Sequence, residues 1–244
     1  MNKNNSSLKI LLVSFAVMSI IGAYYIGYMT ARLGLSAPFL PNNGTTKQAT
    51  APSDAKPEPK MIEEVSAIKL DGDEVFYGDA NSKFVMVTFT DFQCPFCARF
   101  HPSLIGVQKA TNSKLVFKHF PLSFHQYAKD LAHTFECIAK NSSKDNAVAF
   151  ADSVFESNLT SQGQITFTEG KKLANKFLND DVINGCLKDD SITKKIERDY
   201  QEGLQLGIQG TPALYIMNTQ TNKAVRINGA LDQASIQAEF DKLK

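Results

Sequence analysis

Two cysteines that follow closely on an apolar, β-branched segment constrain this chain more than any other feature of its sequence. Residues 83–90 read KFVMVTFT, a composition typical of a buried central strand. The sequence CPFC then occupies 94–97, and its Pro95 suits the first turn of a helix, where a missing N–H costs nothing. Residues 114–120, KLVFKHF, predict a second strand. This order predicts a parallel crossover unit with both cysteines at the strand-to-helix junction.

The elements expected around this unit complete an α/β fold. Residues 74–77 predict a short edge strand, and 125–206 show mainly helical spacing of apolar residues. Strands are expected again at 213–217 and 224–228, separated by a polar turn, and 233–243 can form a terminal helix. The predicted order is therefore β, β, α, β, a helical block, β, β and α.

A long apolar segment lies near the start of the chain. Residues 10–29, ILLVSFAVMSIIGAYYIGYM, carry no charged side chain, and lysines precede them. Roughly twenty apolar residues can cross a bilayer as a helix. We therefore predict a transmembrane anchor at 10–30, with a cytoplasmic tail at 1–9 and the rest of the chain exported. A cleaved signal peptide is the alternative, but the run exceeds the usual signal core of about 7–15 residues.

Residues 31–60 are expected to form a flexible linker. From Ser36 to Lys60 the sequence is rich in Pro, Thr, Ala, Asn and Lys, with almost no large apolar group after Leu40. Such a segment cannot bury enough surface to offset the cost of ordering. The globular domain is predicted at 61–244.

The overall charge argues against a nucleic-acid partner. The 26 lysines and arginines nearly balance the 25 aspartates and glutamates, and no basic stripe with interleaved aromatic residues occurs in the sequence. Four cysteines suit an oxidising compartment but are too few for a disulfide-dense miniature scaffold. Composition thus permits thiol chemistry but does not identify it.

The spacing of Cys94 and Cys97 predicts a redox-active pair. A helix N-terminus offers unpaired N–H groups and a partial positive charge, which favour the thiolate of Cys94. The thiolate is the form that attacks a disulfide. Cys97, one turn further along, can then resolve the mixed disulfide by attacking the Cys94 sulfur.

Other uses of this motif fit less well. Haem attachment requires a histidine straight after the second cysteine, where this chain has Ala98. A zinc site requires two further ligands, and no second CxxC or HxxxH motif follows. A purely structural disulfide is the third alternative, although such short rings tend to be labile. We expect neither a metal nor a cofactor.

Several ordered motifs resemble the DsbA-like thioredoxin family. They are TFTDFQCPFC at 88–97, FHP at 100–102, FPL at 120–122 and LGIQGTP at 206–212. The resemblance covers roughly Asp71 to the C-terminus, and several motifs in one order are more specific than CxxC alone. It implies a thioredoxin fold with an inserted α-helical domain at about 122–206.

The resemblance also implies a substrate-binding site beside the cysteines. It implies a cis peptide bond before Pro212, with Thr211 offering backbone groups to an incoming substrate strand. Pro95 and Phe96 are expected to bind substrate with them. Without the resemblance, Pro212 could merely begin an edge strand.

This chain departs from the family pattern at two positions. Family members often carry a buried acid six residues before the first cysteine, where this chain has Thr88. Asp91 is nearer in sequence, but we expect it at the surface, so the proton route at Cys97 is open. The Pro-Phe dipeptide lacks the histidine of the best-known oxidases, which leaves the oxidising strength open too.

The remaining cysteines and the histidines receive structural interpretations. In an exported protein, Cys137 and Cys186 are expected to form a structural disulfide, with two buried free thiols as the alternative. His101, His119 and His125 have no evident partner in the sequence. The phenylalanines around the motif fit either the core or an apolar rim for unfolded substrates.

Together these features predict a membrane-anchored protein thiol-disulfide oxidoreductase, a monomer whose catalytic domain is periplasmic or otherwise extracytoplasmic. Its substrates would be exported proteins with cysteines, and a membrane redox partner would reoxidise Cys94 and Cys97. An oxidase that introduces disulfides is the first choice. The alternatives are a disulfide reductase or isomerase, or a membrane-anchored binding or surface protein with little turnover. Thr88 is the only sequence support for the last of these.

Overall fold

The computed structural model describes residues 60–62 and 68–244 of the chain. The cytoplasmic tail and transmembrane anchor predicted from the sequence lie outside these residues, as does the predicted linker up to residue 59. Within the described part, no helix combines the length and the apolar character that a membrane span requires.

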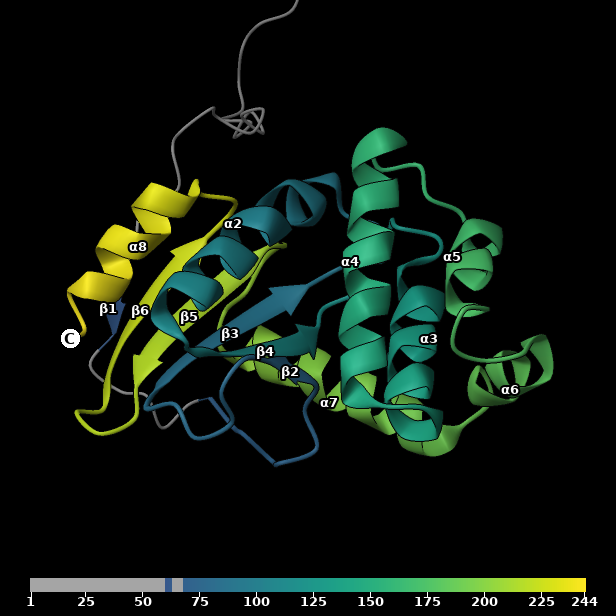
Figure 1. Ribbon diagram of the computed structural model, residues 1–244, viewed down its shortest axis with the longest axis horizontal. Coiled ribbons are helices and arrows are strands. Elements are labelled where there is room, and N and C mark those ends of the chain that lie inside the picture. Colours follow the sequence, from purple (N-terminus) through teal and green to yellow (C-terminus); the bar gives the residue numbers. More distant parts are fainter. Residues whose placement is uncertain (1–59, 63–67) are drawn as a thin grey trace, which may run out of the picture. The chain divides into compact units, whose positions relative to one another are not determined.

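A six-stranded mixed sheet forms the centre of the domain (Figure 1). Its strands are β1 (Lys60–Ile62), β2 (Phe76–Tyr77), β3 (Phe84–Thr90), β4 (Lys114–His119), β5 (Ala213–Asn218) and β6 (Lys223–Asn228). They lie in the order β1-β6-β5-β3-β4-β2. β3 and β4 pair in parallel, and β5 pairs with β3 antiparallel. The predicted crossover is therefore confirmed, and β3 is the inner strand that leads to the cysteines.

The helices divide into those that cover the sheet and those inserted between β4 and β5. They are α2 (Pro95–Thr111), α3 (Ala128–Asn141), α4 (Lys144–Thr160), α5 (Phe167–Ala174), α6 (Asp180–Cys186), α7 (Asp190–Gln205) and α8 (Gln233–Asp241). Figure 1 shows α2 and α8 over one face of the sheet, and α3 to α6 gathered beyond α2. The predicted helical insertion between the two halves of an α/β domain is confirmed.

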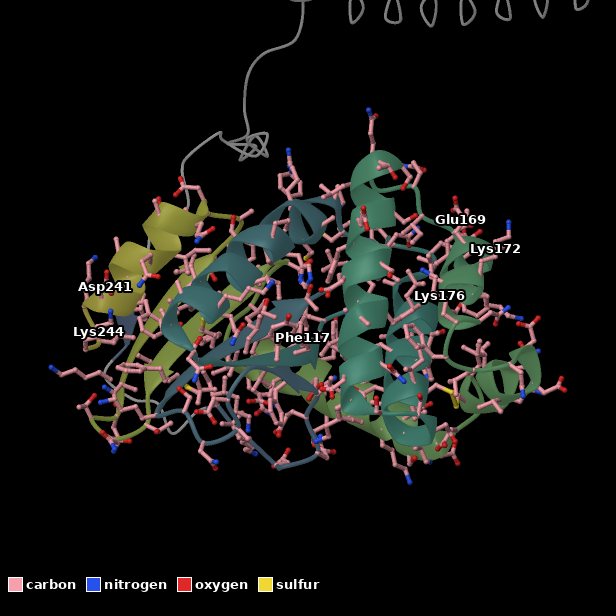
Figure 2. The ribbon with its side chains drawn as sticks, in the orientation of Figure 1. Phe117, Glu169, Lys172, Lys176, Asp241 and Lys244 are labelled. Atoms are coloured by element: carbon pink, nitrogen blue, oxygen red, sulfur yellow. A yellow bond between two sulfur atoms is a disulfide. The ribbon has the colours of Figure 1, made fainter. Side chains whose placement is uncertain are left out.

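The alternation of side chains along β3 creates a core on each face of the sheet. Met86 belongs to the larger cluster under α2 and α8, whereas Val87 and Phe89 belong to a smaller cluster on the opposite face. Phe117, labelled in Figure 2, is buried in the larger cluster. On the opposite face, α7 packs closely: a Cβ added at Gly203 would lie 2.6 Å from the Phe120 ring.

The structure departs from the prediction at the edge strand and at β1, and by one or two residues at the ends of other elements. The edge strand predicted at 74–77 is limited to β2, since Glu74 is buried and binds the backbone of residues 71 and 72. β1 was not predicted, and its first residue is Lys60, the last residue assigned to the linker. β1 has only three residues and pairs with β6 alone, too short a segment for any side-chain period to be visible.

A buried cation fixes α7 to the sheet. Lys118 on β4 is fully buried, and its Nζ lies 2.6 Å from Glu202 Oε2 and 3.4 Å from Asp199 Oδ1, both on α7. Burial alone would lower the pKa of Lys118, but Asp199 and Glu202 raise it above its ordinary value. The lysine is therefore charged, and it neutralises carboxylates that have little access to water.

We expect Lys118→Met to lower the free energy of unfolding by about 3–5 kcal/mol, because two buried carboxylates lose their cation. Urea denaturation measures the change. The matched control is Lys244→Met, which removes an exposed ion pair with Asp241 (2.7 Å; Figure 2) and should have a far smaller effect. Equal effects of the two substitutions would contradict this account of the buried cluster.

Candidate active site

The two cysteines occupy the junction between β3 and α2. Cys94 is the N-cap residue of α2 and Pro95 opens the helix, as predicted. The Cys94 N–H donates to the Asp91 backbone oxygen (3.1 Å), which closes the turn between strand and helix. Cys94 and Cys97 are free thiols with only 3% and 2% of their surface exposed. Access to the pair is therefore limited.

The pKa values of the two cysteines are shifted in opposite directions. The pKa of Cys94 is lowered to about 6, chiefly by a hydrogen bond from the Cys97 thiol, and burial opposes this effect. Backbone N–H groups of Cys97 and Phe96 and a contact with Thr211 add to it. Burial and the neighbouring Cys94 charge raise the pKa of Cys97 well above its ordinary value. Near neutral pH, the pair thus holds one thiolate and one thiol.

A cis-proline loop lies beside the cysteines. The Thr211–Pro212 peptide bond is cis, and the Cys94 sulfur lies 3.6 Å from the Thr211 carbonyl oxygen. Next to it is a hollow of about 410 Å³. The hollow is lined by Gly207, Gln209, Gly210, Thr211, Pro212, Arg226, Asn228 and Gly229. Thr211 thus borders the reactive sulfur, and both predicted residues, Thr211 and Pro212, line the hollow.

The aromatic residues around the motif separate into core and rim. Phe92 and Phe100 are buried, whereas Phe96 is 53% exposed and carries the Arg99 guanidinium 4.5 Å from its ring centroid. Phe124, which sequence reasoning missed, is 76% exposed. Pro95 is partly exposed. Of the phenylalanines considered for an apolar rim, Phe96 is therefore the exposed one, and Phe124 adds an exposed ring beside His125.

The expectation that Asp91 lies at the surface is wrong. Its side chain is buried and accepts three hydrogen bonds. The donors are Gln93 N–H (2.7 Å), Leu122 N–H (2.8 Å) and His125 Nδ1 (2.8 Å). These bonds satisfy the carboxylate without water and tie the passage before Cys94 to the loop after β4.

Gln93 holds the same loop from its other end. Its side-chain oxygen accepts the Tyr127 N–H (2.8 Å), and its amide donates to the Ile165 carbonyl (3.1 Å). The residues of the passage 91–93 therefore clamp residues 122–127 against the start of α2.

The histidines that lacked partners in the sequence all have carboxylate partners in the fold. His101 Nε2 lies 2.6 Å from Asp152, and His119 Nε2 lies 2.7 Å from the buried Glu136. His125 contacts Asp91, as described. Partners between 17 and 51 positions away in sequence cannot be recognised from local spacing.

Thr88 offers no carboxylate to Cys97. It is buried on β3, and its hydroxyl has no hydrogen-bond partner within the described part of the chain. Contacts with Thr90 and Thr211 partly offset the high pKa of Cys97, but neither residue is an acid. Thr90 is in register with His119 on β4, so the imidazole bound to Glu136 lies one strand away.

Cys137 and Cys186, the cysteines paired in the sequence analysis, form a disulfide with an S–S distance of 2.02 Å. The bond joins α3 to the end of α6, within the inserted helices. The second cysteine pair is thus separate from the redox pair.

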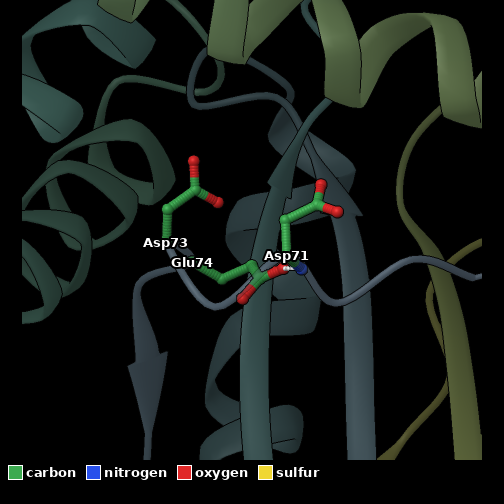
Figure 3. Close-up of side chains that lie close together, drawn as sticks. All are labelled: Asp71, Asp73 and Glu74. Atoms are coloured by element: carbon green, nitrogen blue, oxygen red, sulfur yellow. Dashed lines mark hydrogen bonds between the residues drawn. The ribbon is translucent and has the colours of Figure 1, made fainter.

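Three acidic side chains lie close together on the loop before β2 (Figure 3). Ligand atoms of Asp71, Asp73 and Glu74 lie within 4.8 Å of one another. Arg198 pairs with both aspartates, at 3.2 and 2.8 Å, and Glu74 accepts backbone N–H groups of residues 71 and 72. The carboxylates are therefore already partnered within the protein.

Comparison with known families identifies the fold. The thioredoxin family model matches residues 70–233, two thirds of the chain. The chain belongs to the thioredoxin family. A comparison with curated proteins finds no match.

Solved structures place the chain near the DsbA proteins of this family. DsbA2 of Pseudomonas aeruginosa is 25% identical, with a TM-score of 0.53, covering 70% of this chain and 93% of its own. The thiol-disulfide exchange protein alpha-DsbA2 of Wolbachia pipientis is 20% identical, with a TM-score of 0.61 and coverage of 71% and 89%. A periplasmic thioredoxin-like protein of Salmonella enterica serovar Typhimurium is 20% identical, with a TM-score of 0.53 and coverage of 72% and 92%.

The family match and these neighbours confirm the DsbA-like resemblance found in the sequence motifs. They also confirm the predicted class of enzyme, a protein thiol-disulfide oxidoreductase.

We expect the alkylation rate of reduced Cys94 to rise with pH through a midpoint near 6 and then to level off, because only the thiolate reacts. Cys97→Ala should move the midpoint upward, since it removes the hydrogen bond that contributes most to the low pKa. Cys97→Ser keeps a donor and should move it less. Iodoacetamide labelling at several pH values, followed by mass spectrometry, measures all three profiles.

Proposed function

We propose that this enzyme is an extracytoplasmic oxidase that introduces disulfides into exported proteins. The observation that carries the proposal is the low pKa of Cys94, about 6, beside a buried Cys97 whose pKa is raised. A stabilised thiolate favours the reduced form of the pair, and the corresponding disulfide is therefore a stronger oxidant.

The reaction balances as a two-electron exchange. A substrate thiolate attacks the Cys94 sulfur of the Cys94–Cys97 disulfide, and Cys97 leaves and takes up a proton. A second substrate thiolate attacks the substrate sulfur of the mixed disulfide, and Cys94 leaves as its stabilised thiolate. The substrate is oxidised to a disulfide, and the enzyme is left with one thiolate and one thiol.

The hollow beside the Thr211–Pro212 bond supports binding of an extended substrate segment. Thr211 lines this hollow, and its carbonyl oxygen lies 3.6 Å from the Cys94 sulfur. The exposed ring of Phe96, two residues after Cys94, offers an apolar surface. Backbone groups bind a strand irrespective of its side chains, which suits an enzyme with many substrates.

The proposed location rests on the N-terminal sequence and on a neighbour. The apolar residues 10–29 are long enough to anchor the chain in the cytoplasmic membrane, and the linker to residue 60 would hold the domain outside. The Salmonella neighbour is described as periplasmic. A membrane-bound oxidant would return the cysteines to the disulfide.

In redox equilibrium with glutathione, the full-length protein in detergent should behave as an oxidant. We expect glutathione to reduce the Cys94–Cys97 disulfide readily, at a potential well above about −270 mV, the value typical of thioredoxin. Quantified thiol labelling across glutathione ratios measures the equilibrium. A disulfide that glutathione cannot reduce would contradict the oxidase assignment and favour a reductase or a binding protein.

Cys97→Ser should trap substrates on Cys94. The variant cannot use Cys97 to release a mixed disulfide, and an unfolded protein with a single cysteine has no second thiol to release it either. Covalent complexes should therefore accumulate when oxidised glutathione supplies the oxidant. Non-reducing electrophoresis detects the complexes, and Cys94→Ser/Cys97→Ser is the matched control. If the variant captures no more substrate than this control, an exchange role for Cys94 is excluded.

A further inference from the structure

The loop after β4 folds back onto the motif and brings a histidine to it. The Phe120 N–H donates to the Thr90 oxygen (2.9 Å), and the Leu122 N–H donates to Asp91 (2.8 Å). The His125 N–H then donates to the Leu122 oxygen (3.0 Å). The ring of His125 is thereby presented to the passage that leads into Cys94, with 17% of the side chain exposed.

Asp91 holds this ring in one orientation and in its charged form. The carboxylate is buried and accepts the His125 Nδ1 proton at 2.8 Å, together with two backbone N–H groups. Nδ1 is thus the donor to Asp91, and Nε2 is left to carry the second proton. The backbone oxygen of Asp91 receives the Cys94 N–H (3.1 Å), so one residue contacts both the histidine and the cysteine.

Other charges near the pair are few. Phe96 stands between the cysteines where a charged residue could stand, and the guanidinium of Arg99 lies on its exposed ring. The loop 207–212 and the α4–α5 connection at 161–166 contain no titratable residue. Lys129 and Asp130 open α3, and His101 is paired with Asp152 on α4. Arg226 lines the hollow beside Pro212, where it donates to the Leu206 and Gly207 carbonyls. Among these residues, His125 is the cation bound to the segment that leads into Cys94.

We propose that the His125 imidazolium, fixed by Asp91, is an electrostatic positioning residue that stabilises the Cys94 thiolate from outside the CPFC motif. This inference rests on the proposed function. The imidazolium supplies the positive charge that the Pro-Phe dipeptide lacks. No proton is transferred between His125 and Cys94.

The titration of the groups agrees with this arrangement. The hydrogen bond to Asp91 raises the pKa of His125, against the effect of partial burial, and the charges of Asp91 and Cys94 add to the rise. Cys94 loses its proton near pH 6, below the pH at which a histidine with a raised pKa loses its charge. Thiolate and imidazolium therefore coexist around neutral pH.

A purely structural role for His125 would give a different result. When the ring is replaced, Leu122 still donates to Asp91 and Tyr127 still donates to Gln93, so the loop retains two of its three ties to residues 91–93. His125→Gln removes the charge, and His125→Lys removes the ring but keeps a positive charge. Both variants lose the imidazole ring that links the loop to Asp91, but only His125→Gln loses the positive charge.

The experiment compares these variants as full-length proteins, by the pH profile of Cys94 alkylation and by redox equilibrium with glutathione. We expect His125→Gln to raise the Cys94 pKa and to slow alkylation at pH 6 about twofold or more. The disulfide should become less oxidising in the same variant. His125→Lys should retain a Cys94 midpoint near that of the unaltered chain.

The matched control is His133→Gln, the same substitution at a buried histidine that binds Lys129 O and Thr193 rather than the motif passage. It should leave the Cys94 profile unchanged. Equal upward shifts in His125→Gln and His125→Lys, or no shift in His125→Gln, would overturn the inference. The proposed function fails separately, if the unaltered chain itself lacks a low-pKa Cys94.

Discussion

The buried carboxylate of Asp91 is the interaction on which the rest of the site depends. A charged group without water must be fully hydrogen-bonded, and Asp91 meets this requirement only through donors from the passage before Cys94 and from the loop after β4. The backbone of both segments is thereby fixed at the mouth of the crossover. The Asp91 side chain therefore fixes the position of the His125 ring relative to Cys94 at the N-terminus of α2.

Each face of the sheet carries its own buried cluster of charged side chains. On the α7 face, Lys118 neutralises Asp199 and Glu202 in a buried cluster. On the α2 face, His119 and Lys195 share Glu136, 2.7 Å from each. Both clusters involve the carboxyl-terminal end of β4, and both join it to the inserted helices. The insertion is thus held to the thioredoxin core by buried ion pairs as well as by apolar packing.

The crossover unit was predictable because its signals are local. β3 shows six consecutive buried residues, a pattern that only a central strand explains, and Pro95 marks the helix start. The Asp91–His125 contact was missed because its partners lie 34 positions apart. A signal did exist: both residues follow the carboxyl ends of neighbouring parallel strands, which meet at one edge of a sheet. β1 gave no signal at all, since three residues show no period.

The near-complete burial of Cys94 has a consequence for selectivity. Only 3% of the residue is exposed, so a partner cysteine on a rigid, convex surface would have little access to the sulfur. A chain segment that can still bend and extend into the hollow beside Pro212 would have better access. An exchange enzyme with this geometry would discriminate between substrates by their flexibility. It would act on a protein substrate before that protein has finished folding. Folded proteins would react little, and no recognition sequence would be needed.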